Sequence, residues 1–188
     1  MNCIEAKPSE NIINKYVLFC LFNLFKIKFP KYYLELTIDV VKNSKIFIFE
    51  KDITIISWYA FCNCECLTKV IIPNTVTIIQ SCAFLSCSNL INIIIPNSVT
   101  KIYYGAFHLC ESLYDIIIPN SVTNIAGYAF SGCKSITSVA IPDSVTNIGN
   151  YSFHGCENLT EVIVPNLDTN IKYNSFPEYI KIIRMKNN

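Results

Sequence analysis

Residues 118–133 read IPNSVTNIAGYAFSGC, and variants of this stretch recur along most of the 188-residue chain. Prolines recur at a step of 23 residues, at Pro73, Pro96, Pro119, Pro142 and Pro165. Phenylalanines keep the same step, at Phe61, Phe84, Phe107, Phe130, Phe153 and Phe176. Because two residue types share one period, the pattern indicates a repeat architecture with a unit of 23 residues.

Cysteine and aliphatic residues follow the same period. Cysteines lie three residues after each of the first five phenylalanines, at Cys64, Cys87, Cys110, Cys133 and Cys156. With the Leu, Val and Ile positions, each repeat supplies about seven apolar side chains, which one repeat alone cannot bury. Repeats stacked at a strand spacing of roughly 4.8 Å would bury them as one core. The sequence therefore predicts a solenoid of about five coils.

Within one repeat, three kinds of local structure are expected. The stretch Asn92 to Ile95 is rich in β-branched residues and ends at Pro96, which cannot donate to a strand ladder. A second short extended stretch is expected at Ser98 to Ile102, and Gly105 to Cys110 has the spacing of one helical turn. The expected fold is an α/β solenoid with a parallel sheet on its concave face and short strands and helical turns outside.

The combination of I-P-x-S-V-x-x-I and A-F-x-x-C at a fixed distance resembles the BspA-like leucine-rich-repeat family. The resemblance covers about Ile53 to Phe176 and returns in several coils. It implies a leucine-rich-repeat fold of a kind found on bacterial and protist surfaces, where such proteins bind other proteins or host surfaces. It does not imply a particular ligand.

Composition narrows the possible functions. The chain is 52% hydrophobic, so it can bury a large core as one continuous body, and only 15% of its residues are charged, with a formal net charge of +1. Because a nucleic-acid binder needs a concentrated basic surface, this balance argues against nucleic acid as a partner. No cofactor is expected.

The repeats are expected to span residues 53–176, with covers at both ends. Residues 31–52 are expected to form a capping hairpin, because Leu34, Leu36 and Ile38 alternate with polar residues. Residues 177–188 are expected to form a C-terminal cap, since Asp168 falls at a buried Val position and Tyr179 at the Cys position.

The first thirty residues allow three interpretations. Tyr16 to Phe25 is apolar except for Asn23, which suits a capping helix, but an uncleaved membrane or secretion signal and a gene-model error remain open. Ten apolar residues are too few for a transmembrane span, and no small-residue cleavage site follows them. The compartment stays open between the cell surface and the cytoplasm.

Cysteines and histidines are the first candidates for chemistry. The cysteine ladder is expected to consist of small buried side chains with reduced thiols, because in-register Cβ atoms stay too far apart for a disulfide. Cys62, Cys64 and Cys66 could contribute to a zinc site, although one intervening residue is a poor ligand spacing. His108 and His154 lie two coils apart on the outer turn and are expected to be solvated.

Strand alternation directs two columns of side chains to the solvent side of the sheet, which we call the sheet face. The polar column is Lys69, Asn92, Asp115, Ser138 and Glu161. Asp115 and Glu161 would lie near 10 Å apart, just beyond the carboxylate spacing of inverting glycosidases, so a glycan-acting enzyme is a remote alternative.

The isoleucine column is Ile71, Ile94, Ile117, Ala140 and Ile163. Solvent normally favours polar side chains at such positions, and a contiguous apolar stripe on a rigid sheet is typical of an interaction surface. The sequence therefore predicts a non-catalytic interaction module that binds a partner protein through these two columns. The alternatives are self-association as a homo-oligomer, a degenerate structural fragment, and cover by the N-terminal apolar segment.

Overall fold

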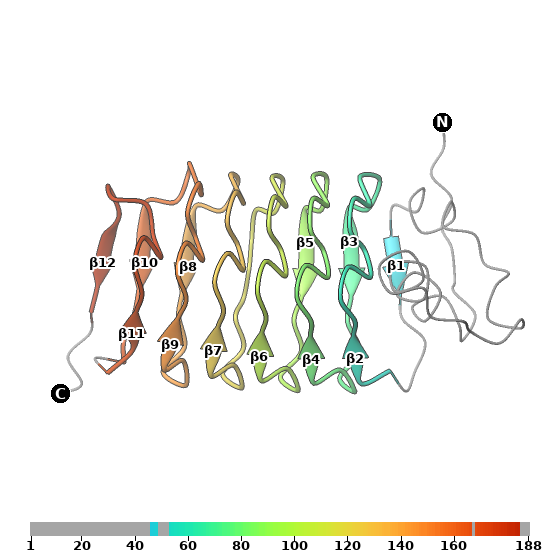
Figure 1. Cartoon of the computed structure of the whole chain (residues 1–188), viewed down its shortest axis with the longest axis horizontal. Coiled ribbons are helices and arrows are strands. Elements are labelled where there is room, and N and C mark those ends of the chain that lie inside the picture. Colours follow the sequence, from blue (N-terminus) through green and yellow to red (C-terminus); the bar gives the residue numbers. More distant parts are fainter. Residues whose placement is uncertain (1–45, 49–52, 167, 185–188) are drawn as a thin grey trace, which may run out of the picture.

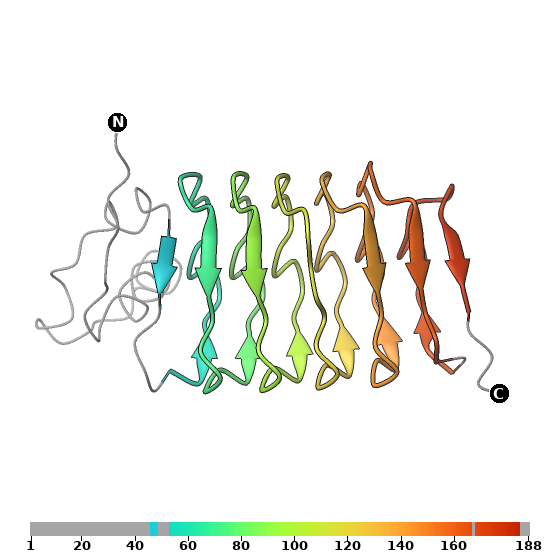
Figure 2. The same cartoon turned by 180° about the vertical axis from the view of Figure 1, so that it is seen from behind.

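The computed structural model describes residues 46–48, 53–166 and 168–184 of the chain. Its coils stack side by side in a row along the long axis of the molecule (Figures 1 and 2). The three-residue strands are β1 (Ile46–Ile48), β3 (Lys69–Ile71), β5 (Asn92–Ile94), β8 (Ser138–Ala140), β10 (Glu161–Ile163) and β12 (Lys181–Ile183). The two-residue strands are β2 (Ile55–Ile56), β4 (Ile78–Ile79), β6 (Lys101–Ile102), β7 (Asn124–Ile125), β9 (Asn147–Ile148) and β11 (Asn170–Ile171).

All strand pairs are parallel and in register, and they form two sides of the solenoid. The two-residue strands make an uninterrupted six-stranded sheet in the order β11-β9-β7-β6-β4-β2. The structure therefore has about six turns rather than the five coils expected, because the irregular stretch after residue 168 still forms β11 and β12. We number coils 1 to 5 from residues 68, 91, 114, 137 and 160, after an initial turn that ends at residue 67.

The three-residue strands do not form one continuous sheet. They divide into β1-β3-β5 and β12-β10-β8, and coil 3 between them contributes only an isolated parallel bridge between Asn92 and Asp115. Figure 2 shows this break as the position between β5 and β8 where the trace carries no strand arrow. The predicted parallel sheet is thus present but interrupted at residues 116–118.

The core consists of the columns that the period predicts. Phenylalanine rings of neighbouring coils stack with centroids 5.0–5.3 Å apart, from Phe61 to Phe176. The ladder cysteines are buried beside them, and the Cys110 thiol donates to the Phe84 carbonyl of the preceding coil at 3.1 Å. Each stacked ring removes a large apolar area from water, which makes this column a main stabilising element of the fold.

The A-F-x-x-C segments are turns, and the described residues contain no helix. Two columns of residues with positive φ interrupt them, represented in coil 2 by Gly105 (φ 59°) and Leu109 (φ 60°). The amides also bond between coils, since the Phe107 amide donates to the Ala129 carbonyl at 2.8 Å. Single local bonds, such as that from the Cys110 amide to the Phe107 carbonyl at 3.2 Å, close the turns without forming a helix, so the expected helical turns are not confirmed. We call this side of the solenoid the turn side.

The two ends continue the coil geometry. β1 pairs in parallel with β3, and the other half of the expected hairpin lies outside the described residues, as does the N-terminal apolar segment. In the last coil Thr169, not Asp168, is buried, and its hydroxyl donates to the Val145 carbonyl at 2.8 Å. Tyr179 is exposed, and its hydroxyl donates to the Cys156 carbonyl at 3.1 Å.

Candidate functional site

The two columns of the sheet face lie side by side along the solenoid. Strand register places Lys69 beside Asn92 and Ile71 beside Ile94. The second sheet places Ser138 beside Glu161 and Ala140 beside Ile163. The strands adopt this register because Val70, Ile93, Val139 and Val162 point into the core, which turns their neighbours toward solvent. The structure thus brings together the residues of each column within the two sheets.

Nine of the ten predicted residues are exposed, and Ile163 is half-buried. Exposure in the isoleucine column rises from 38% at Ile71 to 57% at Ile94 and 74% at Ile117. Ile117 lies in the stretch that belongs to no strand, so the most exposed isoleucine coincides with the break in the sheet. An apolar side chain held this far into water is unfavourable unless another surface covers it.

Two further apolar residues widen this surface. Ile91 is 54% exposed and Tyr114 is 59% exposed, and they occupy equivalent positions in coils 2 and 3, one residue before Asn92 and Asp115. With Ile94 they flank the polar column, which at these coils has apolar side chains on both sides. Strand alternation alone does not predict them, but reading the 23-residue column Thr68, Ile91, Tyr114, Thr137 and Thr160 would have found them.

We call Ile91, Ile94, Tyr114 and Ile117 the apolar patch. The same positions hold Thr137 and Ala140 in coil 4, and Thr68 and the less exposed Ile71 in coil 1, so the most exposed large apolar side chains of the sheet face lie on coils 2 and 3. A local patch of large apolar side chains, rimmed by polar residues, has the composition of a protein interface core.

The polar column holds its two carboxylates two coils apart. Asp115 and Glu161 are separated by Ser138 and by the whole of coil 4. An ion pair joins Lys134 and Glu111 on the turn side, and none joins two members of the polar column, all of which the structure describes.

The ladder cysteines of coils 1 to 4 have the burial of structural residues. The thiols of Cys87, Cys110, Cys133 and Cys156 are fully buried, and burial raises the pKa of each of them. Raised pKa values keep thiols protonated and unreactive at neutral pH.

Cys62, Cys64 and Cys66 do not form a metal centre with any neighbour that the structure describes. Cys64 is buried and the other two are half-buried, and no group of three or more His, Cys, Asp or Glu side chains in the described ranges could hold a metal ion.

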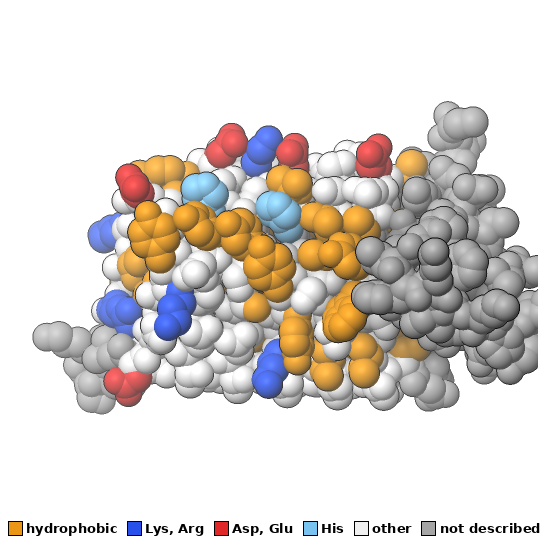
Figure 3. Space-filling view, viewed as in Figure 1, with side chains coloured by type: hydrophobic (Ala, Val, Ile, Leu, Met, Phe, Trp, Pro, Cys, Tyr) orange, Lys and Arg blue, Asp and Glu red, His pale blue; other side chains and the backbone are white. Residues whose placement is uncertain are grey.

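The turn side has an aromatic row that the sequence analysis did not single out. Figure 3 shows a band of apolar side chains on this face, with both histidines at its margin. Tyr128 and Tyr151 stack at 5.1 Å, and Tyr104 lies 5.4 Å from Tyr128. His154 approaches Tyr151 edge-on at 5.4 Å. Because the middle rings stack on one another, they present edges rather than faces to solvent, which leaves little flat surface for a ligand.

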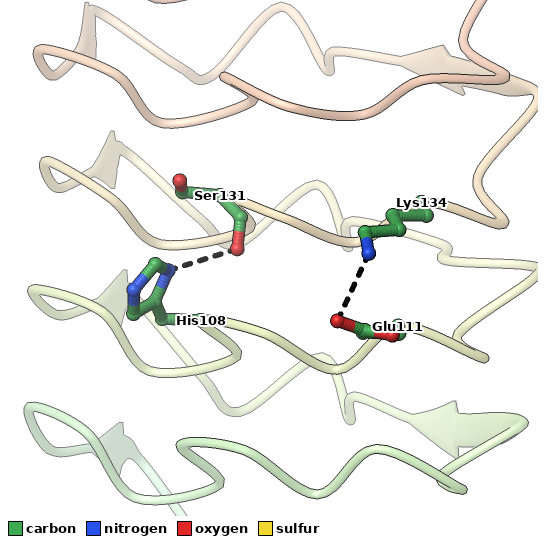
Figure 4. A network of polar contacts seen from close by, with 4 residues as sticks. All are labelled: His108, Glu111, Ser131 and Lys134. Atoms are coloured by element: carbon green, nitrogen blue, oxygen red, sulfur yellow. Dashed lines mark hydrogen bonds and ion pairs between the residues drawn. The ribbon is translucent and has the colours of Figure 1, made fainter.

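The two histidines on the turn side differ in burial and in their contacts. His108 is half-buried, and its Nδ1 donates to the Ser131 carbonyl of the next coil at 2.9 Å (Figure 4). Lys134 Nζ lies 3.1 Å from Glu111 Oε1 beside it, with both side chains well exposed. His154 is exposed, as expected. These contacts link neighbouring coils, and the bond from Nδ1 holds His108 against the next coil, so the expectation that this side chain is solvated is wrong.

A stack of 23-residue coils with parallel strands on two sides defines a leucine-rich-repeat solenoid. The chain belongs to the BspA-type leucine-rich-repeat family: the family model for the BspA type leucine rich repeat region, with six copies, matches residues 1–88 and 54–183. The chain is similar to a leucine-rich-repeat protein of T. pallidum at 30% identity, with a TM-score of 0.65, over 74% of this chain and 72% of that one.

Two further solved structures are similar. A leucine rich cell surface protein of Faecalibacterium prausnitzii is 33% identical over 63% of this chain and 31% of its own length, with a TM-score of 0.61. A leucine-rich-repeat protein of Bacteroides ovatus is 25% identical over 82% of this chain and 50% of its own, with a TM-score of 0.63. The chain thus corresponds to half or less of these two proteins.

No curated protein matches the chain. Among the residues that the structure describes, no helix is long and apolar enough to cross a membrane.

Proposed function

We propose that the protein is a non-catalytic interaction module whose sheet face binds a protein. The observation that carries the proposal is the apolar patch, in which four large side chains, each more than half exposed, lie on two adjacent coils. Membership of a repeat family typical of surface and interaction proteins supports it. The cell-surface description of the Faecalibacterium relative supports a surface location for this chain too.

The isoleucine column and the polar column would contribute to recognition in different ways. The isoleucine column would supply apolar contact area, because burying one such side chain stabilises a complex by about 1.5–3 kcal/mol before ordering costs. Lys69, Asn92, Asp115 and Glu161 would select among partners, since charges at an interface discriminate more strongly than they bind.

The test is capture of partners by the immobilised whole chain and by the double variant Ile94→Glu, Ile117→Glu. We expect the variant to lose the captured protein, because two carboxylates would have to be desolvated in the centre of the interface. Circular dichroism should be unchanged, since both side chains are exposed.

The matched control is Asn97→Glu, Asn120→Glu, in the same two coils but in the turn beyond the strand. The equivalent position in coil 4 is Asp143, so the fold accepts a carboxylate there. The control should retain the captured protein. Retention by both double variants would show that the sheet face is not the binding surface.

A further inference from the structure

The sheet face carries its charges in an uneven order along the solenoid. Lys69 lies on coil 1, while the acidic residues Asp115 and Glu161 lie on coils 3 and 5, with Asn92 and Ser138 between them. One end of the polar column is therefore basic and the rest is neutral or acidic. If two such faces stacked with their coils in the same direction, like charges would lie opposite one another, which is unfavourable. If their coils run in opposite directions, the basic end of one face lies over the acidic part of the other, which is favourable.

We propose that the sheet face binds a second copy of this chain, in a face-to-face dimer whose two-fold axis runs parallel to the strands and passes between coils 2 and 3. The proposal rests on the proposed function and names its partner. A two-fold axis in this direction reverses the order of the coils but keeps each column opposite the same column of the partner. Apolar side chains then meet apolar side chains, and polar ones meet polar ones.

The register follows from the side chains. With the axis between coils 2 and 3, Ile94 lies opposite a second copy's Ile117, Ile91 opposite its Tyr114, and Asn92 opposite its Asp115. The two-fold axis makes each of these contacts occur twice, so all four apolar residues of both copies, between 54% and 74% exposed in a single copy, would be covered. An amide facing a carboxylate can donate a hydrogen bond to it.

The flanking coils agree with this register. Coil 1 would face coil 4, so the large Ile71 lies opposite the small Ala140, and Lys69 lies opposite Ser138. Because phenylalanine rings of adjacent coils are 5.0–5.3 Å apart, Lys69 would sit between Asp115 and Glu161 of the second copy, one coil to either side. Moving the axis onto coil 3 would set Lys69 against Glu161, but it would also set Asp115 against its own copy. It would leave Ile91 and Ile94 opposite the smaller Thr137 and Ala140, so the apolar patch of one copy would no longer cover that of the other.

The dimer is expected to be reversible. Five coils, each with four residues across the face as in residues 91–94, give the face an outline of about 300 Å², which is well below the roughly 800 Å² per partner of standard stable interfaces. The dimer should therefore appear and dissociate over an accessible range of protein concentration.

The experiment is sedimentation velocity on the whole chain and on two variants of one exposed residue, Asn92→Lys and Asn92→Asp, over the widest attainable concentration range. Asn92→Lys places an ammonium opposite Asp115 of the second copy and should lower the dimer dissociation constant roughly tenfold. Asn92→Asp places a carboxylate there and should raise it by a similar factor. Overall charge predicts the opposite order, since the net charge is +1 and the aspartate variant brings it to zero.

Asn97→Lys and Asn97→Asp, outside the face, are the matched controls and should leave the constant unchanged. The inference is overturned if the chain is a monomer throughout, if both Asn92 variants shift the equilibrium in one direction, or if the Asn97 pair reproduces their effects. Suppose that the chain is a monomer and captures a foreign protein that the variant Ile94→Glu, Ile117→Glu no longer captures. This result would overturn the dimer and leave the proposed function standing. A monomer that captures nothing would overturn both.

Discussion

The buried and outward columns of the solenoid follow different rules, although the same 23-residue period generates both. The phenylalanine column keeps one residue type through six turns, and none of its rings is more than 8% exposed. The column that begins at Thr68 changes to Ile91, Tyr114 and then back to Thr137 and Thr160. Stacking constrains the buried positions because each must fit its neighbours, while solvent leaves the outward positions open to selection for binding.

The largest effect that would test this comparison is expected at Phe130. Its ring is fully buried between Phe107, at 5.2 Å, and Phe153, at 5.1 Å. Phe130→Ala should lower the free energy of unfolding by about 3–5 kcal/mol, because it removes a stacked ring and leaves a cavity. Denaturant unfolding measures this loss. Phe130→Leu, the control, should lose less, and an equal loss in both variants would contradict the role given to stacking.

The next largest effect on stability is expected at Gly149, where the backbones of two neighbouring coils approach closely. A Cβ added at Gly149 would lie 2.3 Å from the Gly127 nitrogen in the neighbouring coil. Gly149→Ala should therefore destabilise the fold by about 1–3 kcal/mol, since the coils must move apart. Ala126 occupies the equivalent position one coil earlier, so Ala126→Gly is the control. It should cost only about 0.5–1 kcal/mol, and the two variants should differ in thermal unfolding.

The buried thiols predict a pH dependence. Burial raises the pKa of Cys156 to about 12, whereas an unfolded thiol titrates near 8.5. Above that unfolded value the unfolded chain loses a proton that the native chain keeps. Stability is therefore fully present below about pH 8.5 and falls, by up to about 1.4 kcal/mol per pH unit, as pH rises toward the folded pKa.

The comparison that isolates this thiol is Cys156→Ala against the unchanged chain, with unfolding free energies measured at pH 8 and pH 10. The variant is less stable at pH 8 because it loses packing, but its stability should fall less between the two values. Parallel pH profiles for both proteins would argue against a buried, protonated Cys156.

The smallest effect on stability is expected on the sheet face. Ile117 is 74% exposed, and Ile117→Thr keeps the branched shape, so the free energy of unfolding should change by about 0.5 kcal/mol or less. The same substitution should weaken capture of a partner or the dimer, which binding and sedimentation measure. A loss of stability as large as that at Phe130 would mean that Ile117 packs within its own chain.

The sequence predicts the buried columns well because stacking repeats one local environment in every coil. Phe130, Cys133 and Val122 occupy the positions that the period assigns to them, and all three are fully buried. The outward direction of Lys69, Ile71, Asn92 and Ile94 is confirmed too, since alternation about a buried Val70 or Ile93 permits no other arrangement.

The features that escaped prediction depend on backbone geometry between coils. The positive φ at Gly105 and Leu109, which turns an expected helical turn into an irregular one, serves hydrogen bonds to the neighbouring coil. The break at residues 116–118 and the buried Thr169 beside Asp168 are likewise local departures from the period. The 23-residue period describes only what the coils have in common, so it does not predict departures in a single coil.

The interrupted side of the solenoid also has a mechanical consequence. The six-stranded sheet runs without a gap, while the opposite side is joined between β5 and coil 3 by a single bridge from Asn92 to Asp115. Bending that opens the interrupted side at coil 3 breaks fewer strand hydrogen bonds than bending at any other coil. The stack therefore has one compliant point and one easy direction of flexure, and the apolar patch lies directly across it.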